Sequence, residues 1–405
     1  MDKIAGKLFS KYARLFVVAA LLLASFVVVG GSASAEGRPA SGTVYTLANA
    51  AAGNAVAVYD RAPDGTLALA YTVPTGGLGT GASLSSQGAL AISDNGRWLF
   101  AVNAGSNDIS VFDTNGAGRK ADATTPTANS ADHHNQQLRL VDRIASGGTD
   151  PVSLTSHDDI LYVLNAGVPN NITGFQVGHG GTISRINGST QPLSGANTGP
   201  AEIQFSNNGR VLVVTEKATN KLDTYTVNSH GRADGPNVQN SAGTTPYGFA
   251  FDSRNHPIVS EAFGGAANGS AASSYALNNA GTLTTVSASV PTNQTAACWV
   301  AISKNGRFAY TANAGSGSIT GYSITGYSIA HDGSLTLLDP SGITGVTGNG
   351  STPTDLAVSS DGKFLYSLDA GSHAFSGFQI GHDGSLTPVS TTTGLLPGTV
   401  GLVAR

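Results

Sequence analysis

The sequence predicts an all-β fold, a seven-bladed β-propeller of four-stranded antiparallel blades whose ring is closed by a C-terminal strand in the first blade. Three observations predict it: a composition rich in glycine and poor in charge, a strand–turn–strand phrase that recurs along the chain, and a unit divided between the two chain ends. Four antiparallel strands that recur at such intervals are typical of propeller blades.

The composition favours short strands joined by tight turns. The chain has 405 residues, of which 11% are charged and 53 are glycine, against about 25% charged and about 7% glycine in an average chain. A helical protein would need more Lys, Glu and Arg on its wet faces. The single cysteine, Cys298, excludes an internal disulfide and cysteine-based metal centres. The net charge of −4 argues against nucleic acid as a partner.

One phrase defines the unit. Residues 89–105 read ALAISDNGRWLFAVNAG, residues 299–315 read WVAISKNGRFAYTANAG, and residues 355–371 read DLAVSSDGKFLYSLDAG. Each predicts two strands joined by an Asn-Gly or Asp-Gly hairpin turn, because such pairs supply the positive φ that the turn needs. A third alternating strand, a second glycine turn and a fourth strand complete the unit. Units begin near Gln87, Pro151, Pro200, Pro246, Ala297 and Pro353.

A seventh unit is split between the chain ends. Residues 44–60 resemble the second and third strands of a unit with no first strand before them, and residues 397–403 resemble a first strand with nothing after it. We expect the last segment to pair inside the first blade, which closes the ring and removes its free edges.

Two segments depart from the repeat. Residues 115–134, rich in Ala, Thr and Asn, form an insertion in blade 2 that we interpret as a surface loop. In blade 6 residues 319–323 are repeated at once as residues 324–328, which predicts a bulge or a longer hairpin.

The first 35 residues have the pattern of a signal peptide. Four basic residues precede an apolar run at 15–29, which is short for a membrane span, and Ala33-Ser34-Ala35 offers a cleavage site. We therefore expect a signal peptide at 1–35, a linker at 36–42 and the propeller at 43–405. The protein would be secreted or periplasmic, monomeric, and without a transmembrane segment after cleavage. The alternative is an uncleaved N-terminal anchor.

The repeats place two rings of residues on one face, which we call the predicted mouth. One ring closes the second strands (Asn49, Asn103, Asn165, Glu216, Glu261, Asn313 and Asp369), and the other opens the first strands (Ala89, Ser153, Glu202, Gly248, Trp299, Asp355 and Thr399). Grouped carboxylates can act as an acid–base pair or bind Ca²⁺. The alternative is that they cap turns of their own backbone. We expect no required cofactor, and Ca²⁺ is the cation that such a cluster accepts.

Other side chains at this mouth could bind substrate. Lys217 and Lys221 could hold a carboxylate substrate or an oxyanion. Trp299 and Tyr247 could stack on a ring-shaped ligand, although core packing is the alternative. Of the nine histidines, His373 alone falls on this face, as a candidate base or a plain loop residue; the others fall on the opposite face or in the insertion, where we expect them to be exposed.

These residues resemble the seven-bladed lactonase propeller family, which includes 6-phosphogluconolactonase-type and carboxymuconate-cyclase-type proteins. The resemblance covers about residues 43–405 and lies in the repeated turn phrase, in Gly199-Pro200 at the start of blade 4, and in the closing segment 397–402. Residues 309–313 are also similar to the YVTN repeat. The resemblance implies the propeller fold and lactone chemistry.

The sequence departs from the family at its reactive positions. The family pattern opens blade 4 with Gly-Pro-Arg-His, whereas this chain has Ala201 and Glu202 after Gly199-Pro200. The leading hypothesis is an exported lactonase-like enzyme in which Glu216 acts as base, Glu261 and Glu202 assist, and Lys217 or Lys221 offsets negative charge. Asp355 and Asp369 would then contact a small lactone or carboxylate. The alternative is a non-catalytic binding propeller.

Overall fold

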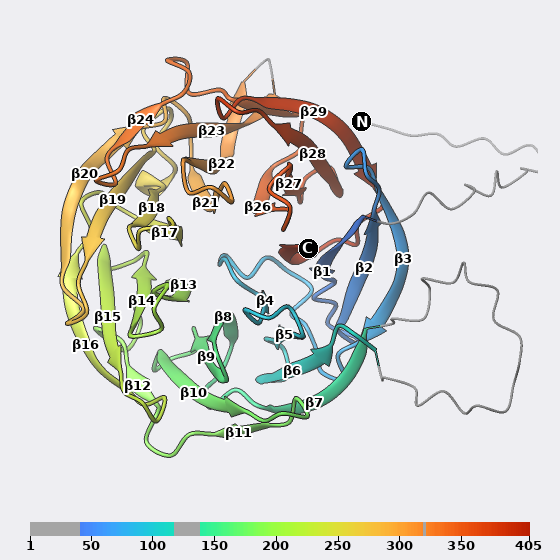
Figure 1. Cartoon of the computed structure of the whole chain (residues 1–405), viewed down its shortest axis with the longest axis vertical. Helices are drawn as coiled ribbons and strands as arrows, with labels where there is room; N and C mark the ends of the chain where they lie inside the picture. The colour runs from blue at the N-terminus through green and yellow to red at the C-terminus, as the bar shows by residue number, and fades with distance from the viewer. Residues whose placement is uncertain (1–40, 117–137, 319–320) are drawn as a thin grey trace, which may run out of the picture. The chain divides into compact units, whose positions relative to one another are not determined.

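The repeated units fold as seven antiparallel sheets arranged in a ring (Figure 1). The computed structural model describes residues 41–116, 138–318 and 321–405. The predicted signal peptide, most of the predicted linker and most of the blade 2 insertion lie outside these residues. Among the described residues, no helix is long and apolar enough to cross a membrane.

Each sheet forms one blade, with its first strand nearest the centre of the ring (Figure 1). The strands of blades 1 to 3, from the centre outward, are β30 (Val400–Ala404), β1 (Gly42–Leu47), β2 (Ala55–Arg61) and β3 (Leu67–Pro74); β4 (Leu90–Ile92), β5 (Trp98–Asn103), β6 (Asp108–Asp113) and β7 (Arg139–Ala145); and β8 (Pro151–His157), β9 (Ile160–Asn165), β10 (Asn171–Val177) and β11 (Ile183–Arg185), with β12 (Gln191–Pro192) also paired to β10.

Blades 4 to 7 repeat the pattern. Their strands are β13 (Pro200–Phe205), β14 (Val211–Glu216), β15 (Lys221–Val227) and β16 (Ala233–Asn240); β17 (Pro246–Phe251), β18 (Pro257–Glu261), β19 (Ala271–Leu277) and β20 (Leu283–Pro291); β21 (Ala297–Ile302), β22 (Phe308–Ser318), β23 (Gly321–Ile329) and β24 (Leu335–Leu337), with β25 (Gly345–Gly348) on β23; and β26 (Pro353–Val358), β27 (Phe364–Asp369), β28 (Ala374–Ile380) and β29 (Leu386–Thr393). A 3₁₀ turn, η2 (Phe263–Gly265), follows β18.

The predicted ring closure is confirmed. The C-terminal strand β30 pairs antiparallel with β1, so that Val44 lies opposite Ala404 and Tyr45 opposite Val403. Each innermost strand contacts the innermost strand of the next blade, from β30 through β4 and onward to β26, which returns to β30. The ring therefore has no open edge at its centre.

The blades pack face to face, and this decides which strands are buried. The second strands β5, β14 and β27 are buried along their whole length, because a neighbouring blade covers each face. In the outer strands β3 and β29 only the first residue is buried, and the other residues are half-buried or exposed. The strands with the strongest apolar character thus lie inside the ring wall.

A tyrosine in the repeated phrase ties one blade to the next. Tyr162, Tyr310 and Tyr366 each donate their hydroxyl hydrogen to a glycine carbonyl in the third-to-fourth turn of the following blade, at 2.7, 3.0 and 2.8 Å. The acceptors are Gly231, Gly384 and Gly65, all with positive φ. A repeated residue therefore makes a repeated contact between blades.

The duplicated segment of blade 6 forms a longer hairpin with an irregularity, as predicted. Asn313 pairs with Ser323 and Ser318 with Gly321, so the register shifts between Asn313 and Ser318 and β22 carries the additional residues. The extra sequence lengthens one hairpin and leaves the blade in the ring.

Candidate functional site

The connection between β3 and β4 crosses the predicted mouth. In Figure 1 this light blue connection runs into the centre of the ring. Its residues 84–88, which we call the plug segment, bond to several blades. Ser86 Oγ donates to the carbonyl of Val152 at 2.8 Å, and the Gln87 N–H donates to the carbonyl of Ala201 at 3.1 Å. These are the opening strands of blades 3 and 4, so the plug segment covers the face that the repeats identified.

Gln87 anchors the plug segment to the far side of the channel. Its Nε2 donates to the Val300 carbonyl at 2.7 Å, and the Val300 N–H donates to its Oε1 at 2.9 Å. The side chain passes so close to Gly248 that a Cβ there would lie 2.1 Å from Gln87 Oε1. Glycine at this ring position is therefore required by the plug segment.

The aromatic residues predicted to bind a ligand lie under the plug segment. Tyr247 and Trp299 are 7% and 5% exposed and contact each other with ring centroids 5.1 Å apart. Trp299 Nε1 donates to the Ser86 carbonyl at 2.9 Å. These contacts are those of core packing, the alternative role predicted for the two residues, and ligand binding by them stays a prediction.

Lys217 belongs to the same cluster. Its Nζ lies 4.7 Å from the centre of the Tyr247 ring and donates to the Ser85 carbonyl. Burial lowers the pKa of Lys217 to about 8 and raises the pKa of the neighbouring Cys298 thiol to about 12. Cys298 is buried, so it matches the inert thiol expected of a lone cysteine.

Beneath the plug segment lies a cavity of about 580 Å³ in the channel. One end is bounded by Gln87 and Gly88, and the other by Asp94, His157 and Asn207 in the first-to-second turns of blades 2 to 4. The described residues that line the cavity, which we call its described wall, include no Lys or Arg. Cavities of this size hold small molecules.

Two buried carboxyl groups line this cavity, and both were predicted as site residues. Glu202 is 1% exposed; its Oε2 accepts the Phe249 N–H at 2.6 Å and its Oε1 accepts Gln204 Nε2 at 2.8 Å. Asp355 is 3% exposed, and its Oδ1 accepts the Leu356 N–H at 2.8 Å. They come from blades 4 and 7, which the channel brings together.

Burial disfavours the charged form of both groups. It raises the pKa of Asp355 to about 8, against hydrogen bonds from the backbone that lower it. Burial also raises the pKa of Glu202 well above its usual range; the hydrogen bond from Phe249 lowers it, and the charge of Asp355 raises it further. At neutral pH the Asp355 carboxyl group is therefore mostly neutral, burial favours the neutral form of Glu202 as well, and a charge on Asp355 makes Glu202 hold its proton more tightly.

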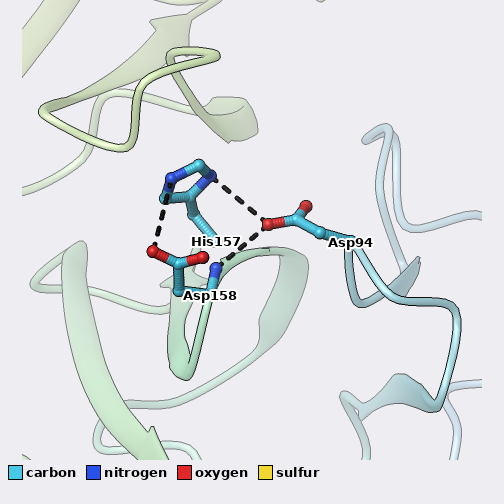
Figure 2. Close-up of side chains that lie close together, drawn as sticks. All are labelled: Asp94, His157 and Asp158. Carbon is cyan, nitrogen blue, oxygen red and sulfur yellow. Dashed lines mark hydrogen bonds and ion pairs between the residues drawn. The ribbon is translucent and has the colours of Figure 1, made fainter.

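The open end of the cavity carries an imidazole between two carboxylates (Figure 2). His157 Nδ1 lies 3.4 Å from Asp94 Oδ2, and Nε2 lies 3.8 Å from Asp158 Oδ2. The Asp158 N–H also donates to Asp94 Oδ2 at 3.0 Å. Within the described ranges these three residues are the group whose donor atoms lie close enough together to hold a metal ion. Both aspartates are exposed.

The residues that close the second strands are buried rather than open to the channel. Every member of this ring is 0% exposed: Asn49, Asn103, Asn165, Glu216, Glu261, Asn313 and Asp369. Each bonds to neighbouring strands or connections. Asp369, for example, accepts the hydroxyls of Ser367 and Ser376 at 2.7 and 2.5 Å, and burial raises its pKa to about 7. None of these seven residues lines the described wall of the cavity.

Glu216 holds the connection that leads into its own blade. Its Oε1 accepts the Ser194 N–H at 3.0 Å, and its Oε2 accepts the hydroxyls of Ser194, at 2.5 Å, and Thr219. Glu261 is bound in the same way, by the Gly243 N–H at 2.8 Å and the hydroxyls of Ser273 and Ser289. Burial raises the pKa of Glu261.

Asp223, which the repeats did not indicate as a site residue, lies beside Glu216. The Ser194 N–H that reaches Glu216 also donates to Asp223 Oδ2 at 2.8 Å, while Asp223 Oδ1 is buried without a hydrogen-bond partner. Burial, followed by the hydrogen bond and charge of Glu216, raises the pKa of Asp223 to about 8. A proton held by Asp223 would let the two carboxyl groups hydrogen-bond to each other. The only signal in the sequence is an acid in the middle of a predicted strand, two residues after Lys221.

The remaining predicted residues lie apart from the cavity. Lys221 donates to Asn240 Oδ1, and His373 is exposed with a φ of 51° in the turn before β28. The expectation that the opposite-face histidines are exposed is wrong for His157 and His256, which are half-buried. His256 bonds through Nδ1 to the buried Asp252 at 2.9 Å, and His157 packs against Phe205.

Comparisons with known proteins agree with the fold. Residues 259–399 match the family described as "Lactonase, 7-bladed beta-propeller", which confirms the predicted resemblance over that part of the chain. The sequence matches no curated protein.

Solved structures extend the likeness around the ring. A Bacteroides fragilis protein proposed to be a 6-phosphogluconolactonase shares 16% identity, with a TM-score of 0.61 over 89% of this chain and 97% of its own. A periplasmic gluconolactonase of Pseudomonas aeruginosa shares 14%, with a TM-score of 0.62 over 89% and 98%. A Lactobacillus plantarum protein shares 14%, with a TM-score of 0.65 over 89% and 98%. At these identities the likeness establishes a lactonase-like propeller fold.

Proposed function

We propose that this chain, whose residues 259–399 match the seven-bladed lactonase family, binds and hydrolyses a small uncharged lactone in its central channel. The observation that carries the proposal is the convergence of Glu202 and Asp355, from opposite parts of the chain, on one cavity of about 580 Å³. Two carboxyl groups with raised pKa values, one of which is raised further by the charge of the other, supply both an acid and a base.

Lactone hydrolysis adds water to the carbonyl carbon and breaks the ring C–O bond. In this proposal Asp355, with a pKa of about 8, ionises and takes a proton from the attacking water, and its charge raises the pKa of Glu202. Glu202 keeps its proton and donates it to the alkoxide that leaves. Gln204, which bonds to Glu202 Oε1 at 2.8 Å, orients that carboxyl group.

The charge of the cavity selects the substrate class. The similar structures carry the names of a gluconolactonase and a proposed 6-phosphogluconolactonase. A phosphorylated substrate needs cationic partners, yet the described wall has neither Lys nor Arg, and Glu202 stands where the family pattern has His. We therefore place an unphosphorylated lactone ahead of a sugar phosphate.

The predicted catalytic roles of Glu216, Glu261, Lys217 and His373 stay alternatives to this assignment. Glu216 and Glu261 are sealed under connecting segments and do not line the described cavity wall. For them to act, the segments that carry Ser194 and Gly243 would have to open. The variants Glu216→Gln and Glu261→Gln separate the two assignments.

A non-catalytic binding propeller is the second candidate. It is favoured because Ala201 and Glu202 stand where the family pattern has an Arg-His pair. The same cavity would then bind an uncharged ligand without turning it over, which saturation without hydrolysis would reveal.

The test uses the purified full chain and a panel of sugar and aliphatic lactones, with and without Ca²⁺ or EDTA. We expect hydrolysis of an unphosphorylated lactone, lost in Glu202→Gln and in Asp355→Asn and retained in Glu216→Gln. Equal turnover in EDTA is expected, since the proposal needs no metal. Turnover that survives both cavity variants and fails in Glu216→Gln would move the site to the predicted ring.

We also infer export, from the signal-peptide pattern at residues 1–35. The mature protein would be a secreted or periplasmic monomer that begins near residue 36. N-terminal sequencing of the protein recovered outside the cytoplasm tests cleavage after Ala35, and sedimentation tests the monomer. An intact N-terminus in a membrane fraction would support the alternative, an uncleaved anchor.

A further inference from the structure

We infer that the channel is a blind well that is entered from the face of the first-to-second turns, opposite the predicted mouth, and that its entrance favours uncharged or cationic small molecules over anions. The inference rests on the proposed function, because it names the route and the charge class for the same cavity. It follows from three observations: the hydrogen bonds that close the mouth end of the cavity, the exposed residues that line its opposite end, and the charges of the residues along it.

The mouth end is closed by hydrogen bonds to three blades. The plug segment is bonded to Val152 in blade 3, Ala201 in blade 4 and Val300 in blade 6. A segment anchored on both sides of a channel spans it. The residues beneath it, Tyr247, Cys298 and Trp299, are at most 7% exposed, so a ligand has no path past them in this conformation.

The opposite end is lined by side chains that reach solvent. Asp94 and Asn207 are exposed and both border the cavity, and His157 between them is half-buried. His157 also borders a second cavity of about 490 Å³ between blades 3 and 4. The well therefore opens among the turns that follow β4, β8 and β13.

The charges along this route are negative or neutral. Asp94 and Asp158 flank the entrance through His157 (Figure 2), while Glu202 and Asp355 line the interior. With no Lys or Arg on the described wall, an anion passes the exposed carboxylates of Asp94 and Asp158 and finds no counter-charge further in. A low-dielectric passage lined by one sign of charge concentrates the opposite sign and repels its own.

The single native cysteine makes the route testable by thiol labelling, without any turnover. Ala91 lines the cavity on β4 and is half-buried, so Ala91→Cys puts a thiol in the well, while Cys298 of the wild type reports on the plug side. Gln204→Cys is a second well variant in case the first does not fold. The probes are a cationic and an anionic methanethiosulfonate. The rate at which each reagent labels the protein is divided by the rate at which the same reagent reacts with a free thiol in solution.

We expect Cys298 to stay unlabelled in the folded protein and the well cysteine to react. The cationic reagent should react faster than the anionic one by about tenfold at low salt, and this ratio should fall in high salt and in Asp94→Asn with Asp158→Asn. Asn207→Trp at the entrance should slow labelling several-fold, whereas Ala82→Trp beside the plug segment should not.

Three outcomes would overturn the inference. Slowing by Ala82→Trp and not by Asn207→Trp would place the entrance at the predicted mouth. Equal normalised rates for the two reagents would remove the charge selection. A well cysteine that resists both reagents, in both well variants, would mean that the cavity is closed at both ends. The lactone assay can fail while labelling succeeds, so the two proposals fail separately.

Discussion

The side chain of Gln87 forms a two-point hydrogen bond with the backbone of Val300, 213 residues away in the sequence. Nε2 donates to the carbonyl at 2.7 Å and the backbone N–H donates to Oε1 at 2.9 Å. Val300 lies on β21, where its backbone groups face the channel and have no further inner strand to pair with. The plug segment thus gives the backbone N–H and carbonyl of Val300 hydrogen-bond partners at the inner edge of blade 6, and the same contact closes the channel.

Replacement of Gln87 by Ala should destabilise the protein and open the mouth. The change leaves the Val300 N–H and carbonyl unpaired, and an unsatisfied buried group costs about 1–3 kcal/mol, so we expect a loss of about 2–4 kcal/mol in the free energy of unfolding. Denaturant titration measures it, and Cys298 should become reactive before global unfolding. Ser83→Ala, exposed in the same connection, is the control and should change stability by less than about 0.5 kcal/mol.

The result would be contradicted by an unchanged denaturation midpoint together with an unreactive Cys298. Gly248→Ala is a second probe of the same contact, because its Cβ would lie 2.1 Å from Gln87 Oε1. Loss of stability in Gly248→Ala alone, with Gln87→Ala neutral, would assign the glycine to packing against the Cys298 carbonyl instead.

The fold was predictable from the sequence because its determinants are local and repeated. Asn-Gly and Asp-Gly turns mark the first hairpin of blades 2, 4, 6 and 7, and the split unit at the chain ends predicted the pairing of β30 with β1. The tyrosine contacts between blades follow from the same phrase, since Tyr310 and Tyr366 occupy equivalent positions in two copies.

The site was predictable only in part, because its key contact is not local. The repeats placed Glu202 and Asp355 near the channel, and both line the cavity. Nothing near Gln87 in the sequence indicates that its partner is Val300. Gly248 carried a weak signal, as a glycine at a ring position where other blades have side chains. The repeats also could not show that Glu216 and Glu261 turn into connecting segments instead of the channel.

Stability should decrease as the pH rises from about 5 to about 8. Asp223 and Asp355 have pKa values of about 8 and Asp369 of about 7 in the folded state, against about 3.9 in an unfolded chain. Between these values the folded state binds more protons than the unfolded one, so each group lowers the free energy of unfolding by about 1.4 kcal/mol per pH unit. Thermal melts across this range measure the slope.

Asp223→Asn isolates one of these contributions. An amide stays neutral and can donate to Glu216, so the variant should lose part of the slope and melt higher than the wild type at pH 8, with a smaller difference at pH 5. Asp158→Asn is the matched control, because its side chain is 86% exposed. A slope unchanged by Asp223→Asn would show that Asp223 is ionised throughout and shares no proton with Glu216.

Glu261→Ala tests whether the ring carboxylates are structural. Glu261 accepts hydrogen bonds from the Gly243 N–H, Ser273 Oγ and Ser289 Oγ at 2.8, 2.6 and 2.7 Å. Their loss should cost about 2–4 kcal/mol, measured by denaturant titration, with lactone turnover of the folded fraction retained. Unchanged stability with turnover abolished would restore the predicted catalytic role of Glu261.

The rate of lactone hydrolysis should rise with pH as Asp355 ionises, through about pH 8. Below this pH the general base is protonated and inactive, and at higher pH the loss of the Glu202 proton, which the charge of Asp355 opposes, removes the general acid, so kcat should follow a bell-shaped profile. Asp355→Asn should lower kcat by about 10²–10⁴-fold and remove the rising limb, whereas Glu202→Gln should remove the falling limb. Asp332→Asn, in an exposed turn, should leave the profile unchanged. A flat profile in the wild type, or a rising limb that persists in Asp355→Asn, would mean that another group takes the proton from water and that the carboxyl pair in the channel serves binding alone.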